Sequence, residues 1–433
     1  MMSRPGTQRA LVAAVQVLSL AVWFSASAVV PALRESWQIG AAASVWLTAS
    51  VQLGFVTGAI TSTVLNLADR IRPHLLMAGC AMLAAACTGV FALTVDGLAG
   101  AIPLRFLTGV FLAGVYPVGM KLTASWAPPA RRGLAFGVMI GALTLGSALP
   151  HLIDGLGDLP WRGVMGTAAG CALLGAVLAV TLVREGPQLA PGTAPRPYPR
   201  YALAMFAQRG PRLVNLGYFG HMWELYALWT WLPSFLIAGT AARTGRDGVH
   251  VSLLAFLAIG LAGIAGCLAG GWAADRFGRP RAAFTALVVS GACCLASPLF
   301  FTAPPGAVVL LVVVWGAAVI ADSGVFSTAL SEVADKRYVG TALTAQTAIG
   351  FALTVVTIQL VPVLADAVGW RWAFLLLAPG PFVGALAMRA FGRQRRPPAE
   401  AGRLGGEGHG RTPHPCNRRK PDSTAASPPR MAE

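Results

Sequence analysis

The chain has 433 residues, of which 55% are apolar and 12% are charged, whereas charged residues make up roughly 25% of a typical soluble domain. A surface this poor in charge excludes a soluble globular protein, and the mean hydropathy of +0.64 favours a helical membrane protein. The net charge of +16 would suit a nucleic-acid-binding protein, so the positions of the basic residues decide what that charge means.

The basic residues are distributed unequally about the apolar segments. All but six of the 33 Lys and Arg residues fall on one side of the membrane spans proposed below. This bias marks the cytoplasmic side of a membrane protein, so the charge indicates topology and no nucleic-acid partner. We predict a multi-pass protein of the cytoplasmic (inner) membrane with both termini cytoplasmic. The six exceptions are Arg34, Arg105, Arg162, Arg243, Arg246 and Arg371.

The sequence contains no signature of a metal centre, a cofactor site or an enzyme. Six of the seven Cys residues lie inside apolar segments, and none has the spacing of a metal-ligand motif. A phosphate-binding loop of the Gly-x-x-x-x-Gly-Lys-Ser/Thr type is missing from the sequence. We therefore predict no metal, no cofactor and no enzymatic activity.

Twelve apolar segments are long enough to cross a hydrocarbon core of about 30 Å. We expect them to be helices, because only helices and closed barrels satisfy the backbone in lipid. The first segment follows Arg4 and Arg9 and is longer than the apolar region of a signal peptide, so we interpret it as a span. The predicted spans cover residues 10–33, 43–67, 75–95, 98–122, 133–153, 163–183, 211–238, 250–273, 282–302, 306–330, 339–364 and 371–391.

A segment rich in Pro and Arg separates the sixth and seventh spans and divides the chain into halves. We predict an N-terminal six-helix bundle over residues 1–183, a central cytoplasmic loop over 184–210 and a C-terminal six-helix bundle over 211–391. Residues 392–433 are rich in Pro, Gly and Arg, which is typical of a disordered basic tail. The predicted fold class is an all-α integral membrane protein with twelve transmembrane helices in two pseudo-symmetric bundles.

Three short motifs each occur twice in the chain, and the two copies are about 206 residues apart in every case. This common spacing indicates an internal duplication. The two halves are thus parallel repeats about an axis normal to the membrane. Transporters built in this way bind their solute near the midplane, between the repeats. The paired motifs are Asp69-Arg70 with Asp275-Arg276, Arg132 with Arg337, and Trp161-Arg162 with Trp370-Arg371.

The loop from Gly271 to Arg279 resembles the cytoplasmic loop signature of the major facilitator superfamily. The resemblance extends over about residues 10–391. It includes the segment Arg105 to Gly109 in the fourth span, the basic pair before the fifth span and the Trp-Arg pairs that open the sixth and twelfth spans. It implies a secondary transporter with the twelve-helix fold of that family, which works by alternating access. The internal duplication makes a functional monomer the expected state.

The resemblance also implies a conformational switch at the loops. In the family, the Asp of this loop pairs with basic groups and a helix terminus in the outward-open state. The N-terminal copy lacks the final Gly, so its latch is expected to be weaker. The alternative is that these charges only enforce topology. The residues assigned to the switch are Asp69, Arg70, Arg131, Arg132, Asp275, Arg276, Gly278 and Arg279.

Ionisable residues inside spans are costly unless paired, and they therefore indicate candidate sites. Glu224 lies near the middle of the seventh span, and His221 is three residues earlier on the same face. Because His exchanges protons near neutral pH, this pair suits proton coupling; the alternative is a structural hydrogen bond that locks the helix. Asp322 in the tenth span is either a second proton carrier or a helix-end group.

Arg105 lies within the fourth span. Its guanidinium offers a fixed fork of donors to a carboxylate or a small anion, and the resemblance implies proton coupling or anion binding at this position. The alternative is a pair with an acid such as Glu224 that holds the halves together. Trp223 and Tyr226 belong to an aromatic run at helical spacing; such residues usually pack or anchor, but we also assign these two to the solute site.

These features predict a proton-coupled secondary transporter that imports a small organic or inorganic anion, so its partners are a small-molecule solute, protons and the lipid bilayer. Residues 217–231 are similar to bacterial porters of the cyanate and nitrate/nitrite groups. Nitrate itself is not expected, because the sequence lacks the residues that mark nitrate porters. Its second and eighth spans contain no Arg before their basic ends, and its fifth span contains no Asn. A drug/proton antiporter, which exports its substrate, fits the same residues and is the alternative.

Overall fold

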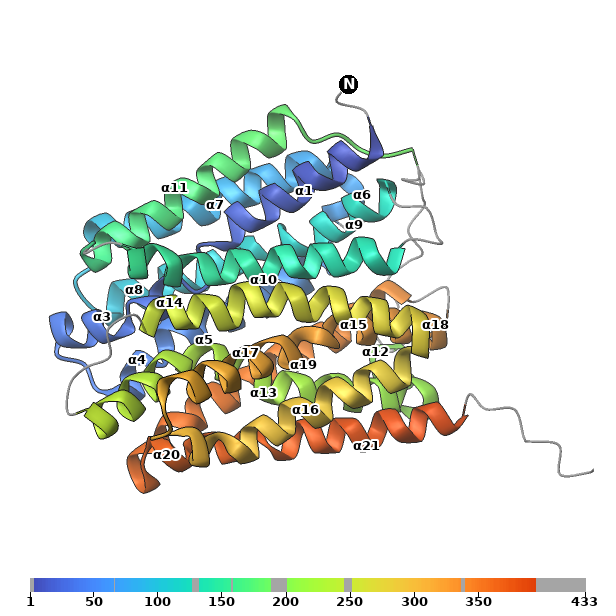
Figure 1. The fold of residues 1–433 in the computed structure, drawn as a ribbon. Coiled ribbons are helices and arrows are strands. Elements are labelled where there is room, and N and C mark those ends of the chain that lie inside the picture. The colour runs from blue at the N-terminus through green and yellow to red at the C-terminus, as the bar shows by residue number, and fades with distance from the viewer. Residues whose placement is uncertain are drawn as a thin grey trace, which may run out of the picture. The chain divides into compact units, whose positions relative to one another are not determined.

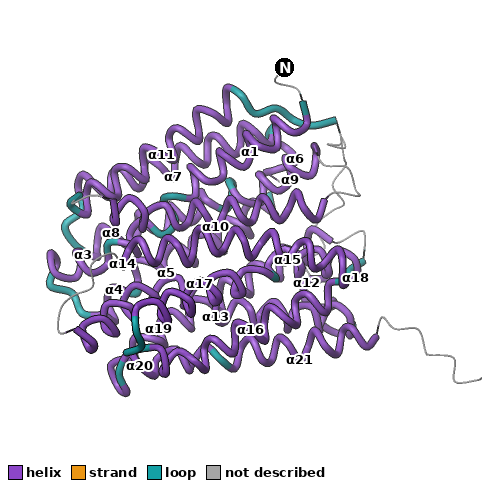
Figure 2. The backbone as a smooth tube through the Cα atoms, in the orientation of Figure 1, coloured by secondary structure: helices purple, strands orange, loops and turns teal. Residues whose placement is uncertain are grey.

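The computed structural model of the chain describes residues 4–65, 67–126, 132–156, 159–187, 201–244, 251–335 and 339–394. Within these ranges the chain forms helices joined by short connections, as Figures 1 and 2 show, and contains no strand. The predicted all-α fold class is confirmed for the described part of the chain. Nearly all of the predicted tail, from residue 395 onward, lies outside the described residues.

The helices alternate in direction, and their bounds agree with the predicted spans to within a few residues. The N-terminal half contains α1 (Pro5–Leu20), α2 (Ser25–Ala28), α3 (Val30–Trp37), α4 (Ala41–Ser44), α5 (Trp46–Val64), α6 (Leu67–Arg70), α7 (Pro73–Thr94), α8 (Leu98–Leu112), α9 (Tyr116–Trp126), α10 (Arg132–Leu156) and α11 (Trp161–Thr181). The C-terminal half contains α12 (Tyr201–Ala204), η2 (Met205–Ala207), α13 (Arg209–Thr244), α14 (Val251–Phe256), η3 (Leu257–Ala262), α15 (Gly263–Phe277), α16 (Arg279–Phe300), α17 (Pro305–Ala321), α18 (Ser323–Val333), α19 (Val339–Val368), α20 (Trp370–Ala373), η4 (Phe374–Leu377) and α21 (Pro379–Gln394).

Eleven helical segments among the described residues are long and apolar enough to cross a membrane. They coincide with eleven of the twelve predicted spans. The first predicted span, over 10–33, is interrupted between Leu20 and Ser25, so it consists of α1, α2 and α3 rather than one helix. The tenth span is also interrupted, at Asp322, where α17 gives way to α18.

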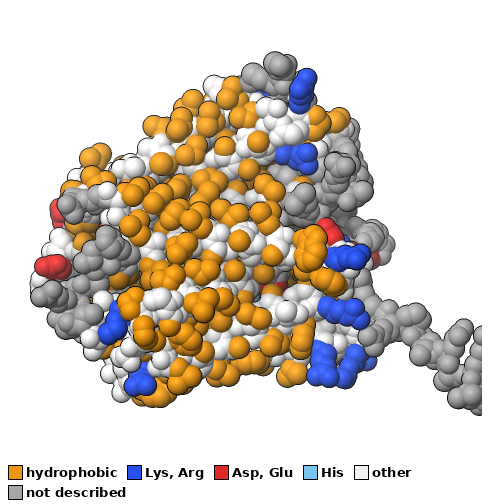
Figure 3. Space-filling view, viewed as in Figure 1, with side chains coloured by type: hydrophobic (Ala, Val, Ile, Leu, Met, Phe, Trp, Pro, Cys, Tyr) orange, Lys and Arg blue, Asp and Glu red, His pale blue; other side chains and the backbone are white. Residues whose placement is uncertain are grey.

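The first helix begins and the last helix ends on the same side of the molecule, on the right in Figure 1. Figure 3 shows a broad hydrophobic belt with Lys and Arg side chains gathered beside it on that side. We call this side the basic end and the other side the opposite end. The prediction that the basic end is cytoplasmic follows from the positive-inside rule. Exposed Arg residues at the basic end include Arg70, Arg72, Arg276, Arg281, Arg389 and Arg393.

Small residues allow the second and fourth spans of each half to approach closely. A methyl group placed on Gly109 of α8 would lie 2.1 Å from the carbonyl oxygen of Val51 in α5. In the C-terminal half, a methyl group on Gly316 of α17 would lie 2.0 Å from the carbonyl oxygen of Ala258 in η3. Only Gly fits at such contacts between membrane helices. The two Gly residues are about 207 positions apart, so the duplication is also visible in the packing.

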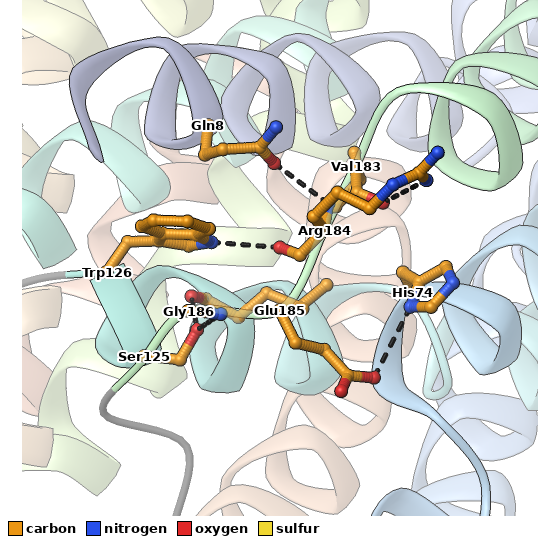
Figure 4. Close-up of polar contacts among 9 residues, drawn as sticks. Gln8, His74, Ser125, Trp126, Val183, Arg184, Glu185 and Gly186 are labelled. Atoms are coloured by element: carbon orange, nitrogen blue, oxygen red, sulfur yellow. Dashed lines mark hydrogen bonds and ion pairs between the residues drawn. The ribbon is translucent and has the colours of Figure 1, made fainter. Parts of the chain in front are cut away.

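The segment after α11 ties together the basic ends of several N-terminal spans (Figure 4). The Gln8 amide of α1 donates to the Leu182 carbonyl at 3.1 Å and accepts from the Arg184 backbone N–H at 2.8 Å. The Trp126 indole N–H of α9 donates to the Arg184 carbonyl at 2.8 Å. Two further contacts complete this strap, Gly186 N–H to Ser125 Oγ at 2.9 Å and His74 Nδ1 with Glu185 Oε1 at 3.3 Å.

The strap predicts a specific loss of stability in the variant Gln8→Ala. Gln8 is fully buried, and its removal takes a partner from two partly buried backbone groups, the Leu182 carbonyl and the Arg184 N–H, at up to about 1–3 kcal/mol for each group. We expect the melting temperature of the purified protein in detergent to fall by several degrees. Gln394→Ala, at an exposed site on the last residue of α21, is the matched control. Equal melting temperatures for the two variants would contradict the bracing role of the strap.

Candidate functional site

The two six-span bundles meet along two helix pairs, α10 with α15 and α5 with α19. We call this contact surface the seam. Near the basic end, the hydroxyls of Thr63 and Thr344 lie 3.2 Å apart across it. Near the opposite end, the Ser252 hydroxyl donates to the Asp154 carboxylate across it. The bundles therefore touch at both ends of the seam.

Six aromatic side chains fill the middle of the seam. Trp23 lies 4.9 Å from Phe55, both in the N-terminal half, and 5.6 Å from Phe351 in α19. The Tyr226 ring lies 5.1 Å from the Phe351 ring and 6.0 Å from the Trp23 ring, all distances being between ring centroids. All six rings are at most 4% exposed. This seam cluster consists of Trp23, Phe24, Phe55, Tyr226, Trp229 and Phe351.

His221 pairs with Asp322 at the interruption of the tenth span. The two side chains are 2% and 1% exposed, and His221 Nδ1 lies 2.9 Å from Asp322 Oδ1. On the other side of the ring, His221 Nε2 lies 2.8 Å from the Ser323 hydroxyl. The imidazole thus connects a carboxylate to a hydroxyl. Such a chain of groups can hold a proton or pass it along.

Glu224 lies one turn farther along α13 but faces a different neighbour from His221. Its Oε1 atom accepts hydrogen bonds from Ser290 at 2.7 Å, from the Cys294 thiol at 3.2 Å and from the Trp315 indole. These donors come from α16 and α17, within the C-terminal bundle. Glu224 is 1% exposed, so this arrangement joins three spans of one bundle through a single carboxylate oxygen.

Arg105 binds the backbone where the first span is interrupted. Its Nη1 donates to the Val22 carbonyl at 2.9 Å and to Ser25 Oγ at 3.4 Å, and its Nη2 donates to the Trp23 carbonyl. Its Nε donates to the Leu47 carbonyl of α5 at 3.2 Å. The side chain is fully buried. Within the described part of the chain, no carboxylate contacts it, so the anticipated pair with Glu224 does not form here.

The remaining predicted site residues separate into two places. Tyr226 lies in the seam cluster. Trp223 faces away from the seam: its indole donates to the Leu376 carbonyl at 2.9 Å, and its side chain packs against Gly380 of α21. The structure therefore brings His221 and Asp322 together and leaves Arg105, Glu224 and Trp223 in three separate environments.

The loop residues of the proposed switch lie at the basic end. Arg279 forms an ion pair with Glu332 of α18. Asp275, which is exposed, lines a cavity together with Arg279, Thr328 and Gly137 of α10. Arg70, Arg276 and Gly278 are exposed. Arg131 and the side chains of Asp69 and Arg132 lie outside the described residues.

Several residues of the site were not anticipated from the sequence. Trp23, Phe55 and Phe351 are apolar residues within apolar spans, so nothing in their sequence context distinguishes them. Ser290, Trp315 and Ser323 are uncharged and become partners of ionisable groups only through the packing of helices far apart in the chain. The group of His, Cys, Asp and Glu residues needed to hold a metal does not occur within the described ranges.

Comparison with known proteins identifies related transporters. A family model described as Major Facilitator Superfamily matches residues 12–358 and, in an overlapping match, 250–424. The "Probable sulfoacetate transporter SauU" of Cupriavidus necator is 29% identical over 211 residues, which cover 43% of this chain and 46% of that protein. The match thus spans less than half of this relative.

Solved structures of the same fold cover most of the chain. The nucleoside transporter NupG has a TM-score of 0.69 at 14% identity and covers 89% of this chain and 99% of its own. The xylose transporter XylE from E. coli has a TM-score of 0.68 at 15% identity and covers 93% and 100%. The human organic anion transporter MFSD10 has a TM-score of 0.66 at 17% identity and covers 88% and 98%.

The geometry at Arg105 predicts that Lys cannot replace it. A Lys ammonium lacks the planar fork that reaches three carbonyls on two spans, and each carbonyl left without a donor costs about 1–3 kcal/mol. We expect Arg105→Lys to lower the melting temperature by several degrees, whereas Arg389→Lys at the exposed basic end does not. An Arg105→Lys protein as stable as the wild type would contradict the structural role and return Arg105 to solute binding.

Proposed function

Because this chain belongs to the major facilitator superfamily, a family of secondary transporters of small solutes, we propose that it is a proton-coupled transporter of a small organic anion. The proposed direction is import across the cytoplasmic membrane, with the basic end in the cytoplasm. The observation that carries the coupling is the buried contact between His221 and Asp322. Solute recognition is proposed to occur at the middle of the seam.

Two relatives support an organic anion as the solute. The curated relative is described as a probable sulfoacetate transporter, and MFSD10 is described as an organic anion transporter. Arg105 supports the same class of solute, because it places a buried positive charge next to the Trp23 backbone. A third relative supports proton coupling, since XylE is described as a proton:xylose symporter.

The position of the His221–Asp322 pair suits a coupling role. The pair lies at the interruption between α17 and α18, and a methyl group on nearby Gly324 would lie 3.1 Å from Ile140 Cδ1 of α10. The pair is therefore close to the seam, on the side of Tyr226 toward the basic end. Alternating access in transporters with parallel repeats is largely a rocking of one bundle against the other. Such rocking would change the access of water to this pair.

A second candidate is export of an aromatic organic compound in exchange for protons. The observation that favours it is the seam cluster, whose six rings offer stacking surfaces to a flat ligand. The two candidates differ in the direction of flux relative to the proton gradient. If protons that flow in one direction drive a lipophilic cation in the opposite direction, the result favours export. If they drive an organic anion in the same direction, the result favours import.

The coupling proposal predicts the behaviour of Asp322→Asn in proteoliposomes. With one proton transported per anion, a gradient of one pH unit drives about tenfold accumulation, because a tenfold ratio corresponds to about 1.4 kcal/mol. We expect Asp322→Asn to lose accumulation of labelled sulfoacetate driven by a pH gradient but to retain exchange of labelled for unlabelled sulfoacetate. The measurement is uptake with and without the gradient, and a protonophore should abolish the wild-type accumulation.

Asp366→Asn is the matched control, because Asp366 is an exposed carboxylate near the C-terminus of α19, at the opposite end of the molecule. It should accumulate the anion as the wild type does. Full accumulation by Asp322→Asn would remove this pair from the coupling mechanism. Wild-type uptake that ignores the pH gradient would contradict proton coupling as a whole.

A further inference from the structure

Five buried side chains around the middle of the seam have polar atoms without a hydrogen-bond partner among the described residues. Each of these side chains is at most 1% exposed. The atoms are the indole nitrogens of two Trp residues, both polar atoms of a Gln side chain, a Ser hydroxyl and both ring nitrogens of a His. The five residues are Trp23, Gln52, Ser147, His151 and Trp229; we call them the donor set.

Three members of the set are tied to the seam cluster. The Trp23 ring contacts Tyr226 and Phe351 of the other bundle. The Trp229 ring lies 5.8 Å from Phe24, also across the seam. Gln52 lies three residues before Phe55 on α5, so the two side chains share the helix face that meets α19.

The other two members lie on the face of α10 that meets the eighth span. A methyl group on Gly260 would lie 3.1 Å from Ala148 Cβ, and one on Gly155 would lie 2.8 Å from the Leu253 side chain. His151 stands between these two contacts along α10, three residues after Ala148 and four before Gly155. Ser147 lies one turn before His151, so both side chains belong to the seam.

Four of the five lie from the middle of the seam toward the opposite end, and the fifth, Trp23, lies beside Tyr226, with 6.0 Å between the two ring centroids. The helices α10 and α13 run toward the opposite end, so Ser147 and His151 on α10 and Trp229 on α13 lie in its direction. The helix α5 runs the other way, so Gln52, which precedes Phe55, also lies in that direction. The donor set, of which Trp23 and Trp229 also belong to the seam cluster, therefore forms one layer from the middle of the seam toward the opposite end, away from the His221–Asp322 pair.

The chemistry of this layer is that of an acceptor-binding site. A buried polar group without a partner costs about 1–3 kcal/mol. Five such side chains in one layer would therefore lower the free energy of unfolding substantially unless a ligand formed hydrogen bonds with them. The indole N–H groups can only donate, the Gln amide offers two donors, and neutral His offers one. A ligand that satisfies the layer must therefore contribute mainly acceptor oxygens.

A fully buried positive charge contacts the donor set. The Arg105 guanidinium donates to the carbonyl of Trp23, which is itself a member of the set. The two fully buried acids lie elsewhere: Glu224 faces α16 and α17, and Asp322 faces His221. The partly buried Asp154, three residues after His151 on α10, accepts a hydrogen bond from Ser252 across the seam. Donors together with an uncompensated guanidinium favour an anionic ligand over a neutral one.

We propose that Trp23, Gln52, Ser147, His151 and Trp229 bind the oxyanion head group of the transported solute, a carboxylate or a sulfonate. The proposal rests on the proposed transport of an organic anion and adds to it the residues that recognise the anion. Among the other rings of the seam cluster, Phe55 follows Gln52 on α5 and Tyr226 precedes Trp229 on α13, so both lie on the side of the basic end.

The test is a binding measurement on the purified full-length protein with the variants Gln52→Leu and Trp229→Phe. Titration calorimetry with sulfoacetate, acetate and methanesulfonate gives the affinities, and neutral acetamide serves as the uncharged comparison. A hydrogen bond to a charged group contributes about 1.5–3 kcal/mol. We therefore expect each variant to weaken anion binding by roughly tenfold to a hundredfold. Acetate and methanesulfonate distinguish a carboxylate-binding from a sulfonate-binding site.

The melting temperature of the ligand-free protein provides a second readout. Gln52→Leu removes a buried amide without a partner, so it should leave this temperature unchanged or raise it. Gln346→Leu is the matched control: Gln346 is also buried, but it donates to Asn215 at 3.0 Å. That variant should lower the melting temperature and leave anion affinity unchanged.

The outcomes separate this inference from the proposed function. If the wild type accumulates sulfoacetate along a proton gradient but Gln52→Leu and Trp229→Phe bind it with wild-type affinity, the donor set is wrong and the transport function stands. If the wild type binds acetamide as tightly as acetate, the oxyanion assignment is wrong. If the wild type binds none of the three anions, both proposals are wrong.

Discussion

The interruption of the first span leaves backbone carbonyls that lipid cannot satisfy, and the arrangement of the N-terminal bundle depends on how Arg105 binds them. The Arg105 guanidinium donates hydrogen bonds to the carbonyls of Val22 and Trp23 and also to that of Leu47 in the second span. An interrupted helix at membrane depth is tolerated only where protein groups replace the missing helical hydrogen bonds. With these bonds made, Trp23 and Phe24 can leave the helical path and enter the seam.

In both bundles, polar groups inside the bundle form hydrogen bonds with one another, whereas the middle of the seam between the bundles is packed with aromatic rings. The C-terminal bundle is held by the three donors that converge on Glu224, and the N-terminal bundle by the strap around Arg184. Across the seam, by contrast, the middle is filled by aromatic rings, whose contacts do not depend on exact direction as hydrogen bonds do. Two internally braced bodies with a smooth contact between them can rock without breaking their own polar networks.

The sequence was informative where the signal was local or statistical. Apolar runs of membrane length and the asymmetry of Lys and Arg predicted the spans, and an ionisable residue in an apolar span is conspicuous, so Arg105, His221, Glu224 and Asp322 were all singled out. Their partners could not be read in the same way. Residues three apart on a helix point in directions about 60° apart, which is enough for His221 to face Asp322 while Glu224 faces Ser290.

The interruption at residues 21–24 was equally hidden, because that segment contains no Pro or Gly to mark it. Trp223 and Tyr226 show the same limit for aromatic residues, since two side chains of one run serve different surfaces. Trp223 bonds to Leu376 within its own bundle, whereas Tyr226 enters the seam. Burial alone gives no guide here, because apolar residues face lipid as well as protein in such a chain.

The buried charges are distributed unequally between the two bundles, and this distribution bears on how an anion and a proton could move together. The N-terminal bundle holds Arg105, which contacts no carboxylate in the part of the chain that the structure describes. The C-terminal bundle holds Glu224 and the Asp322–His221 pair. An anion at the seam would compensate the positive charge of Arg105 in one bundle, and a proton on the His221–Asp322 pair would neutralise that pair in the other. Either ligand alone leaves an uncompensated buried charge, which costs several kcal/mol. Occupancy of both sites is therefore the arrangement with the least charge to desolvate, and in the proposed mechanism that condition would link the movement of the two ligands without any contact between them.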